Sequence, residues 1–142
     1  MGGDGTTVVV RAQGHEHVRA EHESTLEVTT DDWLTPAGDC IVGVEADTTL
    51  ASFDPAVVTA CQDRATAITV TLAAGGHEDT VSGHGHPELT FEDDRSMVLR
   101  TSEHTDDRTL LVGADKAASD LDRELIAALA DGADLTVTIT VA

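Results

Sequence analysis

Histidines at close spacing near the start of the chain are the residues with the most evident chemistry. The stretch from Arg11 to His22, "RAQGHEHVRAEH", contains His15, His17 and His22, and Glu21 directly precedes the last of them. Imidazole and carboxylate groups bind divalent metals such as zinc when several of them converge. The spacing therefore predicts a metal site, with His15 and His22 as its main ligands.

The alternative is a solvated polar face without a ligand. If residues 17–30 form a long or bent strand, alternate side chains point to opposite faces, so His15 and His17 share one face and His22 takes the other. Arg19 falls in the row of His15 and His17, where its positive charge opposes a bound cation. On this interpretation His22 is buried or lies in a pocket, and His17 lies at the surface.

A cluster of positive residues is the second candidate site. Five of the eight Lys and Arg residues lie between positions 95 and 123. Arginine side chains, and a lysine beside the start of a helix, bind phosphate and carboxylate groups. We therefore expect an anionic ligand or partner here, the alternative being ion pairs with the abundant Asp and Glu. The predicted ligand-binding residues are Arg95, Arg100, Ser102, Arg108 and Lys116.

The chain carries a large negative charge. It has 27 Asp and Glu residues against 8 Lys and Arg, a net charge of -19, and the acidic residues are spread between apolar segments instead of forming a tail. Concentrated salt screens such a surface, because the Debye length falls to about 3 Å at 1 M. The composition therefore predicts a globular cytoplasmic protein of a salt-accumulating organism.

Several function classes find no support in the sequence. Aromatic residues make up 2% of the chain, so a stacking platform for nucleic acid is not expected. The sequence shows no apolar run of membrane-spanning length, no signal peptide, no phosphate loop and no serine hydrolase motif. Cys40 and Cys61 are expected to be buried free thiols. Apart from the candidate metal no cofactor is expected, and the pattern specifies no reaction.

An internal duplication is predicted from self-similarity. Residues 46–74 align without a gap to residues 114–142 at an offset of 68, with identities that include Asp54 and Asp122. Upstream, "GHEH" at 14–17 echoes "GHGH" at 83–86. The expected organisation is a single domain, 1–142, with related halves at approximately 11–74 and 80–142.

Each half is predicted to form strand, strand, helix and strand. In the first half the strands are 17–30, 40–46 and 68–72, and the helix starts with Asp54 as cap and Pro55 as its first residue. In the second half the corresponding elements are strands at 96–102 and 109–114, a helix between Ser119 and Gly132, and a strand at 135–141.

Two such units can bury their apolar faces against each other. Joined about a pseudo-twofold axis they close a small barrel, which removes open strand edges. The segment "LTPAGDCIVGV" also resembles a turn of double-psi and cradle-loop barrels, with Gly38, Asp39 and Cys40 as the structural turn. The expected fold is α+β and mainly β, with duplicated ββαβ units in a pseudo-twofold small barrel and two helices. An open α+β sandwich of two sheets is the alternative.

The sequence resembles an archaeal family, domain of unknown function 371, in four segments: "GHEHVRAEHESTLEVT", "LTPAGDCIVGVEAD", "DDRSMVLRTS" and "DDRTLLVGADKAASDLDRELI". They cover most of the chain. The resemblance implies an archaeal cytoplasmic protein and implies no established activity. It weakens the pairing of His15 with His17, because the family commonly has another residue at position 17. The family pattern matches Gly14, His15, His22, Thr25, Glu27, Gly38, Asp39, Cys40, Arg95, Arg100, Ser102, Arg108, Lys116, Asp120 and Arg123.

Three functional hypotheses remain open at this point. The favoured one is a non-enzymatic binding module that holds an anionic ligand or protein partner through the positive cluster of the second half. The second is a metal-binding protein or metal-dependent enzyme that uses His15 and His22. The third is a structural or assembly partner. Neither a nucleic acid nor a membrane is expected as a partner.

Overall fold

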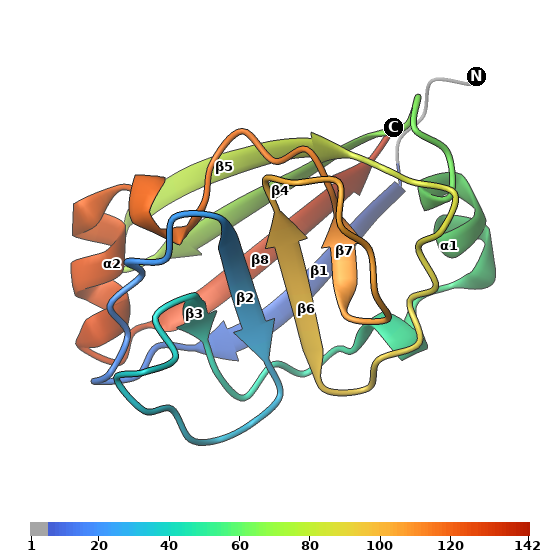
Figure 1. Ribbon diagram of the computed structural model, residues 1–142. Helices are drawn as coiled ribbons and strands as arrows, with labels where there is room; N and C mark the ends of the chain where they lie inside the picture. Colours follow the sequence, from blue (N-terminus) through green and yellow to red (C-terminus); the bar gives the residue numbers. More distant parts are fainter. Residues whose placement is uncertain (1–5) are drawn as a thin grey trace.

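The computed structural model describes residues 6–142, which form two four-stranded sheets and two helices (Figure 1). Sheet A contains four long strands in the order β1-β8-β4-β5, and every neighbouring pair is antiparallel. Its strands are β1 (Thr6–Gln13), β8 (Asp134–Val141), β4 (Ala67–Ala74) and β5 (His77–His84).

Sheet B is built from shorter strands in the order β3-β2-β6-β7. The two central strands are antiparallel, and each edge strand runs parallel to its neighbour. Its strands are β3 (Ile41–Gly43), β2 (Thr25–Thr29), β6 (Ser96–Arg100) and β7 (Thr109–Leu111). Only the central pair therefore forms an extended ladder.

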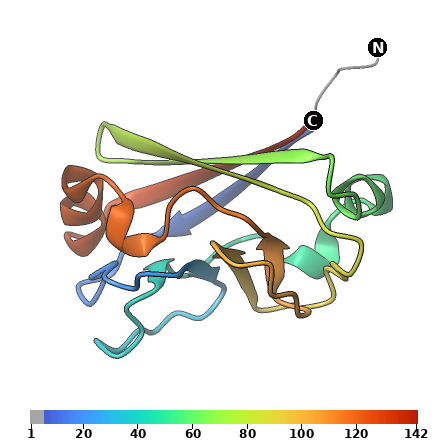
Figure 2. The ribbon, with the colours of Figure 1, turned by 45° about the horizontal axis from the view of Figure 1, so that its top comes forward.

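The two helices, α1 (Pro55–Cys61) and α2 (Arg123–Ala130), lie at opposite ends of the molecule (Figure 2). Asp54 caps α1 by accepting from the Ala56 backbone N–H, and Asp122 caps α2 by accepting from Glu124 and Leu125. These caps satisfy amides that have no partner within the helix. The predicted cap and Pro55 start of α1 are confirmed. The second helix starts later than predicted, because Ala118–Asp120 forms a separate 3-10 turn.

The hydrophobic core lies between the two sheets and is almost entirely aliphatic. Strand β8 illustrates how its residues reach the core, because aliphatic residues and threonines alternate along it. The threonines are not buried, whereas the aliphatic residues on either side of them are: Leu135, Val137, Ile139 and Val141. A side-chain period of two puts one face of a strand in the core. Phe53 and Phe91 add an edge-to-face ring contact at 5.4 Å.

The predicted closed barrel is wrong, and the alternative of two open sheets describes the fold. Outside the named strands the two sheets are joined by two isolated bridges within residues 6–142, Gln13 to Val44 and His84 to Val112. Each bridge pairs the last residue of an edge strand of sheet A with the residue that follows an edge strand of sheet B. The ladder then stops, because the strands of sheet B are too short to continue it.

The predicted long strand at 17–30 is also wrong. Residues 14–24 form a loop, and β2 occupies only Thr25–Thr29. Strands β1 and β5 were not predicted. In β5 a single residue, Val81, is buried, so its sequence lacks the apolar alternation that identifies a strand.

The two halves show the same order of elements. Strands β1, β2 and β3, a 3-10 turn, α1 and β4 are followed by β5, β6 and β7, a 3-10 turn, α2 and β8. Backbone conformation repeats too, because Ala20 and Phe91 both adopt positive φ, at 51° and 52°. None of the helices within residues 6–142 is both long and apolar enough to cross a membrane.

Candidate functional site

The outer face of sheet B, on the side away from the core, carries three of the five predicted ligand-binding residues, Arg95, Arg100 and Arg108. Register pairs Thr25 with Arg100, Glu27 with Val98 and Thr29 with Ser96, so these six residues share a face. The intervening pairs, which include Leu26 with Leu99, are buried in the core. Figure 1 views the molecule from this side.

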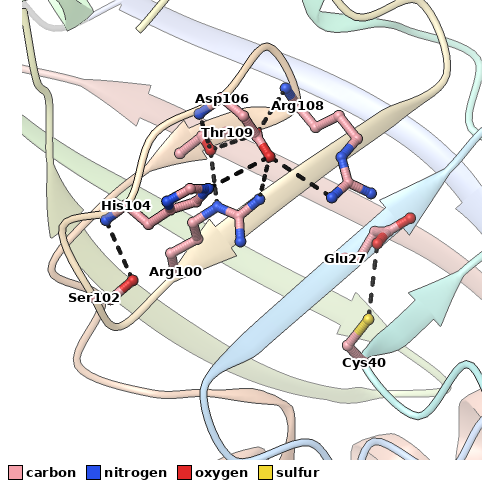
Figure 3. Close-up of polar contacts among 8 residues, drawn as sticks. All are labelled: Glu27, Cys40, Arg100, Ser102, His104, Asp106, Arg108 and Thr109. Carbon is pink, nitrogen blue, oxygen red and sulfur yellow. Dashed lines mark hydrogen bonds and ion pairs between the residues drawn. The ribbon is translucent and has the colours of Figure 1, made fainter. Parts of the chain in front are cut away.

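Asp106 is the centre of a polar cluster on this face (Figure 3). Its Oδ2 accepts a hydrogen bond from Arg100 Nη2 at 2.8 Å, and its Oδ1 accepts from the Thr109 hydroxyl at 2.9 Å. Arg100 Nε donates to Thr109 Oγ1 at 2.9 Å, which closes a triangle. His104 Nε2 and Arg108 Nη2 lie farther from Asp106 Oδ2, at 3.8 and 3.7 Å.

Arg95 is held by a bidentate contact with Asp31. Its Nε and Nη2 donate to the two carboxylate oxygens at 2.8 and 2.9 Å, a geometry that fixes the plane of the guanidinium. Beside this pair is a pocket of about 310 Å³. It is lined by Glu27, Asp31, Asp93, Arg95, Ser96 and Arg108.

The carboxylates of these pairs stay charged. The hydrogen bond from Arg95 lowers the pKa of Asp31 below its usual value. Burial alone would raise the pKa of Asp106, but the Thr109 hydrogen bond and the Arg100 charge outweigh burial and lower it. Both arginines therefore face ionised partners at neutral pH.

The thiol of Cys40 donates to Glu27 Oε1 at 3.7 Å on the same face. Burial, followed by the negative charge of Glu27, raises the pKa of Cys40 to about 11. The nucleophilic form of cysteine is the thiolate, so this thiol is protonated and weakly reactive at neutral pH. The second cysteine, Cys61, is also free, is fully buried and has its pKa raised by burial to about 11.

Arg95, Arg100 and Arg108 are brought together, but the other two predicted ligand residues are not equivalent to them. Lys116 forms an ion pair with Asp79 of β5, in sheet A, and Asp79 also accepts from the Asp122 N–H at the start of α2. Ser102 follows β6, is exposed, and accepts from the His104 backbone N–H at 3.3 Å.

The structure gives His15 and His22 roles in the loop before β2. His15 Nδ1 accepts the backbone N–H of His17 at 3.0 Å. His22 Nδ1 accepts the N–H groups of Ser24 and Thr25 at 3.2 and 3.1 Å. Within residues 6–142, no three or more His, Cys, Asp and Glu side chains are grouped as metal ligands would be. These nitrogens close turns, and the geometry of the described residues does not converge on a metal.

The second half repeats both turns with a register that differs from the sequence prediction. Glu88 N–H donates to His86 Nδ1 at 3.0 Å, as His17 does to His15. Gly85 and His86, at an offset of 71, therefore correspond to Gly14 and His15, and the predicted match of Gly14 with Gly83 is wrong. Asp93 Oδ2 takes the place of His22 Nδ1, accepting from the N–H groups of Arg95 and Ser96.

The turn at Gly38, Asp39 and Cys40 links the loop to sheet B. Gly38 N–H donates to Thr35 O at 2.9 Å, and Glu27 N–H donates to Cys40 O at 2.8 Å. Asp39 O accepts from the N–H groups of Glu21 and His22. The three turn residues thus hold the start of β3 against the loop that carries His22.

Arg123 forms hydrogen bonds with backbone carbonyl groups and has a structural role. Its guanidinium donates to the carbonyls of Ala118 and Ala20, at 2.8 and 3.2 Å, and its Nε donates to Leu121 O. It therefore ties the loop before β2 to the start of α2.

Sequence reasoning missed the carboxylates that complete the site. The sequence does not distinguish Asp31, Asp93 and Asp106 from the other acidic residues, and it predicts Thr109 only as part of a strand. Asp106 and Thr109 are three residues apart in "DDRT", the spacing of a side chain that caps its own turn. That short-range signal could have identified Asp106.

Comparison with known proteins gives two findings. A family model described as "Domain of unknown function (DUF371)" matches residues 10–142. The chain is also similar to "Uncharacterized protein MJ0206" of Methanocaldococcus jannaschii, with 37% identity over 133 residues that cover 94% of this chain and 98% of that protein. The family expected from the sequence is therefore confirmed over nearly the full length.

Replacing His22 tests its role as a turn acceptor. We expect His22→Ala to lower the free energy of unfolding by about 1–2 kcal/mol, because two backbone N–H groups lose their acceptor. His22→Asp, which copies the arrangement at Asp93, should stay within about 0.5 kcal/mol of the wild type. Urea unfolding followed by circular dichroism in 1 M KCl measures both. An alanine variant as stable as the wild type would contradict the structural role.

The reactivity of Cys40 tests its contact with Glu27. With a thiol pKa of about 11, alkylation at pH 8 should be about 100-fold slower than in the unfolded chain, because the thiolate fraction is that much smaller. Glu27→Gln removes the negative charge and should accelerate labelling of Cys40, as measured by peptide mass spectrometry. Cys61 is the internal control, since it has no contact with Glu27. Equal acceleration at both thiols would point to loosening of the fold instead.

Proposed function

This chain belongs to the DUF371 family, and we propose that it is a binding module for a small ligand with an anionic group. The proposed site is the pocket on the outer face of sheet B. Its volume of about 310 Å³ is enough for a small metabolite and too small for a folded partner. The positive residues of the site come from the second half of the chain, as the basic cluster in the sequence indicates.

The position of Arg108 is the observation that supports this proposal. Its Nη2 lies 3.7 Å from Asp106 Oδ2, an oxygen that already accepts from Arg100 at 2.8 Å. The Arg108 side chain is 47% exposed and lines the pocket. A phosphate or carboxylate that enters the pocket can therefore take bidentate hydrogen bonds from Arg108 without breaking a short ion pair.

Arg95 and Arg100 support the site in different ways. Arg100 is 11% exposed at its side chain and holds Asp106 in place. Arg95 is 57% exposed and faces the pocket while two of its nitrogens remain on Asp31. The ligand thus meets one available guanidinium in Arg108 and the outer edge of a second in Arg95.

The other wall of the pocket constrains the ligand further. Glu27, Asp31 and Asp93 all line it, and a purely anionic ligand would be repelled by them. A ligand with an anionic head and a hydrogen-bond donor or positive group at the other end fits both walls. We infer a small zwitterion or a phosphate ester that carries an amine.

An NMR titration tests the site. In uniform 1 M KCl, O-phosphoethanolamine should shift the amide signals of Arg95, Ser96 and Arg108, and inorganic phosphate should shift them with lower affinity. Arg108→Gln should weaken both by at least about tenfold, because one bidentate pair is lost. Arg19→Gln, an exposed arginine of the loop before β2, is the matched control and should change neither. Equal affinities in Arg108→Gln and the wild type would overturn the proposal.

We also infer that the protein is adapted to concentrated salt in the cytoplasm of a halophilic archaeon. The net charge of -19 supports this. So does burial, since the buried polar residues among 6–142 are Thr29, His86, Ser96 and Thr109, with no Asp or Glu. The carboxylates that the structure describes therefore stay in contact with solvent.

Thermal unfolding in a salt series tests this adaptation. The Tm should rise by at least about 10 °C between 0.1 and 2 M KCl, because screening removes repulsion between the carboxylates. Most of the rise should occur below 1 M, where the Debye length changes most. A Tm that does not change with KCl would contradict the inference.

We also propose that the fold arose by duplication of one ancestral half. The shared order of elements supports it, as do the equivalent turns at His15 and His86 and at His22 and Asp93. The ligand site lacks this symmetry. Arg108 corresponds to Cys40, because Glu27 N–H donates to Cys40 O as Val98 N–H donates to Arg108 O.

A further inference from the structure

Within residues 6–142, no helix or strand covers the outer face of sheet A. Figure 2 shows sheet B and both helices below or beside sheet A and no element above it. Register aligns the outward side chains of its four strands into rows. The first row is Thr7, Thr140, Thr69 and Ser82, and the second is Val9, Thr138, Thr71 and Thr80.

These two rows carry no charge. They contain six threonines, a serine and a valine, in a chain with 27 Asp and Glu residues. Val9 is 47% exposed and is one of two exposed large hydrophobic residues within 6–142. Thr71 and Thr80 hydrogen-bond to each other at 3.2 Å, so these two hydroxyl groups already have a partner within the face. Their methyl groups add to its apolar surface.

The third row has a charged residue at each end. It runs Arg11, Thr136, Ala73 and Glu78 across the four strands. Neither Arg11 nor Glu78 takes part in an ion pair within residues 6–142. Three strand spacings separate them, about 14 Å, so they do not contact each other within one chain.

We propose that this face binds the same face of a second copy of the chain, about a twofold axis parallel to the strands. Such an axis places β1 of one copy over β5 of the other and β8 over β4. It sets Arg11 opposite Glu78 of the second copy, and Glu78 opposite Arg11, at both ends of the third row. An isologous interface requires this self-complementarity. An in-plane axis perpendicular to the strands would leave all four charges opposite uncharged residues.

The charge of the whole chain favours a second copy over other partners. A basic partner would be drawn to the carboxylates elsewhere on the surface, and an acidic one would be repelled. Two copies with a charge of -19 each can approach closely only where carboxylates are few or have a positive partner, as Glu78 has in Arg11 of the second copy. Aligned sheets are known to pack face to face, and this arrangement buries the two surfaces that meet.

The size of the face places the proposed interface among the small ones. Four strands of about eight residues span about 27 Å by 19 Å, so two copies bury on the order of 1,000 Å². This area is at the lower limit for a specific interface, so we expect a weak dimer and test a micromolar range of concentrations. Because the charge on the remaining surface opposes association, the dimer should become tighter as salt increases.

Sedimentation equilibrium from 5 to 500 µM protein in 0.2 and 2 M KCl tests the proposal. The wild type should convert from monomer to dimer in 2 M KCl and dissociate in 0.2 M. Thr138→Lys, at the centre of the face, should weaken the dimer by at least about tenfold, because an unpaired charge is buried. It reduces the net negative charge, so general repulsion cannot explain the loss. Ala60→Lys, on the exposed side of α1, makes the same charge change and should have no effect.

A charge exchange tests the axis. Arg11→Glu should weaken the dimer by about tenfold, and the double variant Arg11→Glu with Glu78→Arg should restore it to within about threefold, because the pair forms between copies. Circular dichroism confirms that each variant is folded. A wild type that stays monomeric at 500 µM in 2 M KCl, or a dimer that survives Thr138→Lys, would overturn the interface. Failure of the exchange to restore dimerisation would overturn the axis.

Discussion

The close approach of two glycines to the ends of the two helices is the constraint on which the rest of the structure depends. A Cβ atom on Gly14 would lie 2.1 Å from the carbonyl oxygen of Leu129, and one on Gly85 would lie 2.1 Å from that of Cys61. At these points the chain leaves sheet A and turns toward sheet B. Any side chain at either position would push the loop away from the end of the helix. The histidine after each glycine then closes the turn through Nδ1.

Sequence patterns predicted the elements whose burial is periodic and failed where it is not. Strand β8 and the cap of α1 follow from alternation and from the Asp-Pro pair. Strand β5 has one buried residue, so its own sequence shows no alternation of apolar residues. Its place in the sheet comes from backbone pairing with β4. The closed barrel was wrong for a related reason. Strand length decides whether two sheets join, and the length of a three-residue strand such as β3 is set by tertiary contacts.

The sequence predicts which arginines gather at the candidate site, but it does not predict which carboxylate pairs with each of them. Arg95, Arg100 and Arg108 stand out in a sequence with so few positive residues, and three of the predicted ligand residues do share one face. Which of them is available to a ligand depends on carboxylates that the sequence gives no reason to choose. Asp31 occupies Arg95 and Asp106 occupies Arg100, which leaves Arg108 at 3.7 Å from an oxygen already in use. The distribution of partners, and not the count of cations, defines the site.

The two outer faces of the molecule differ in their charge. On sheet B, arginines and carboxylates alternate at short distance, so the face is locally near neutral yet rich in oriented donors and acceptors, which suits a small polar ligand. On sheet A the two rows of threonine and valine carry no charge, which suits contact with an identical surface. Both faces depart from the acidic surface that a net charge of -19 implies for the rest of the chain. Because most acidic residues of this protein interact with solvent, we propose that another molecule binds where the carboxylates are paired or absent.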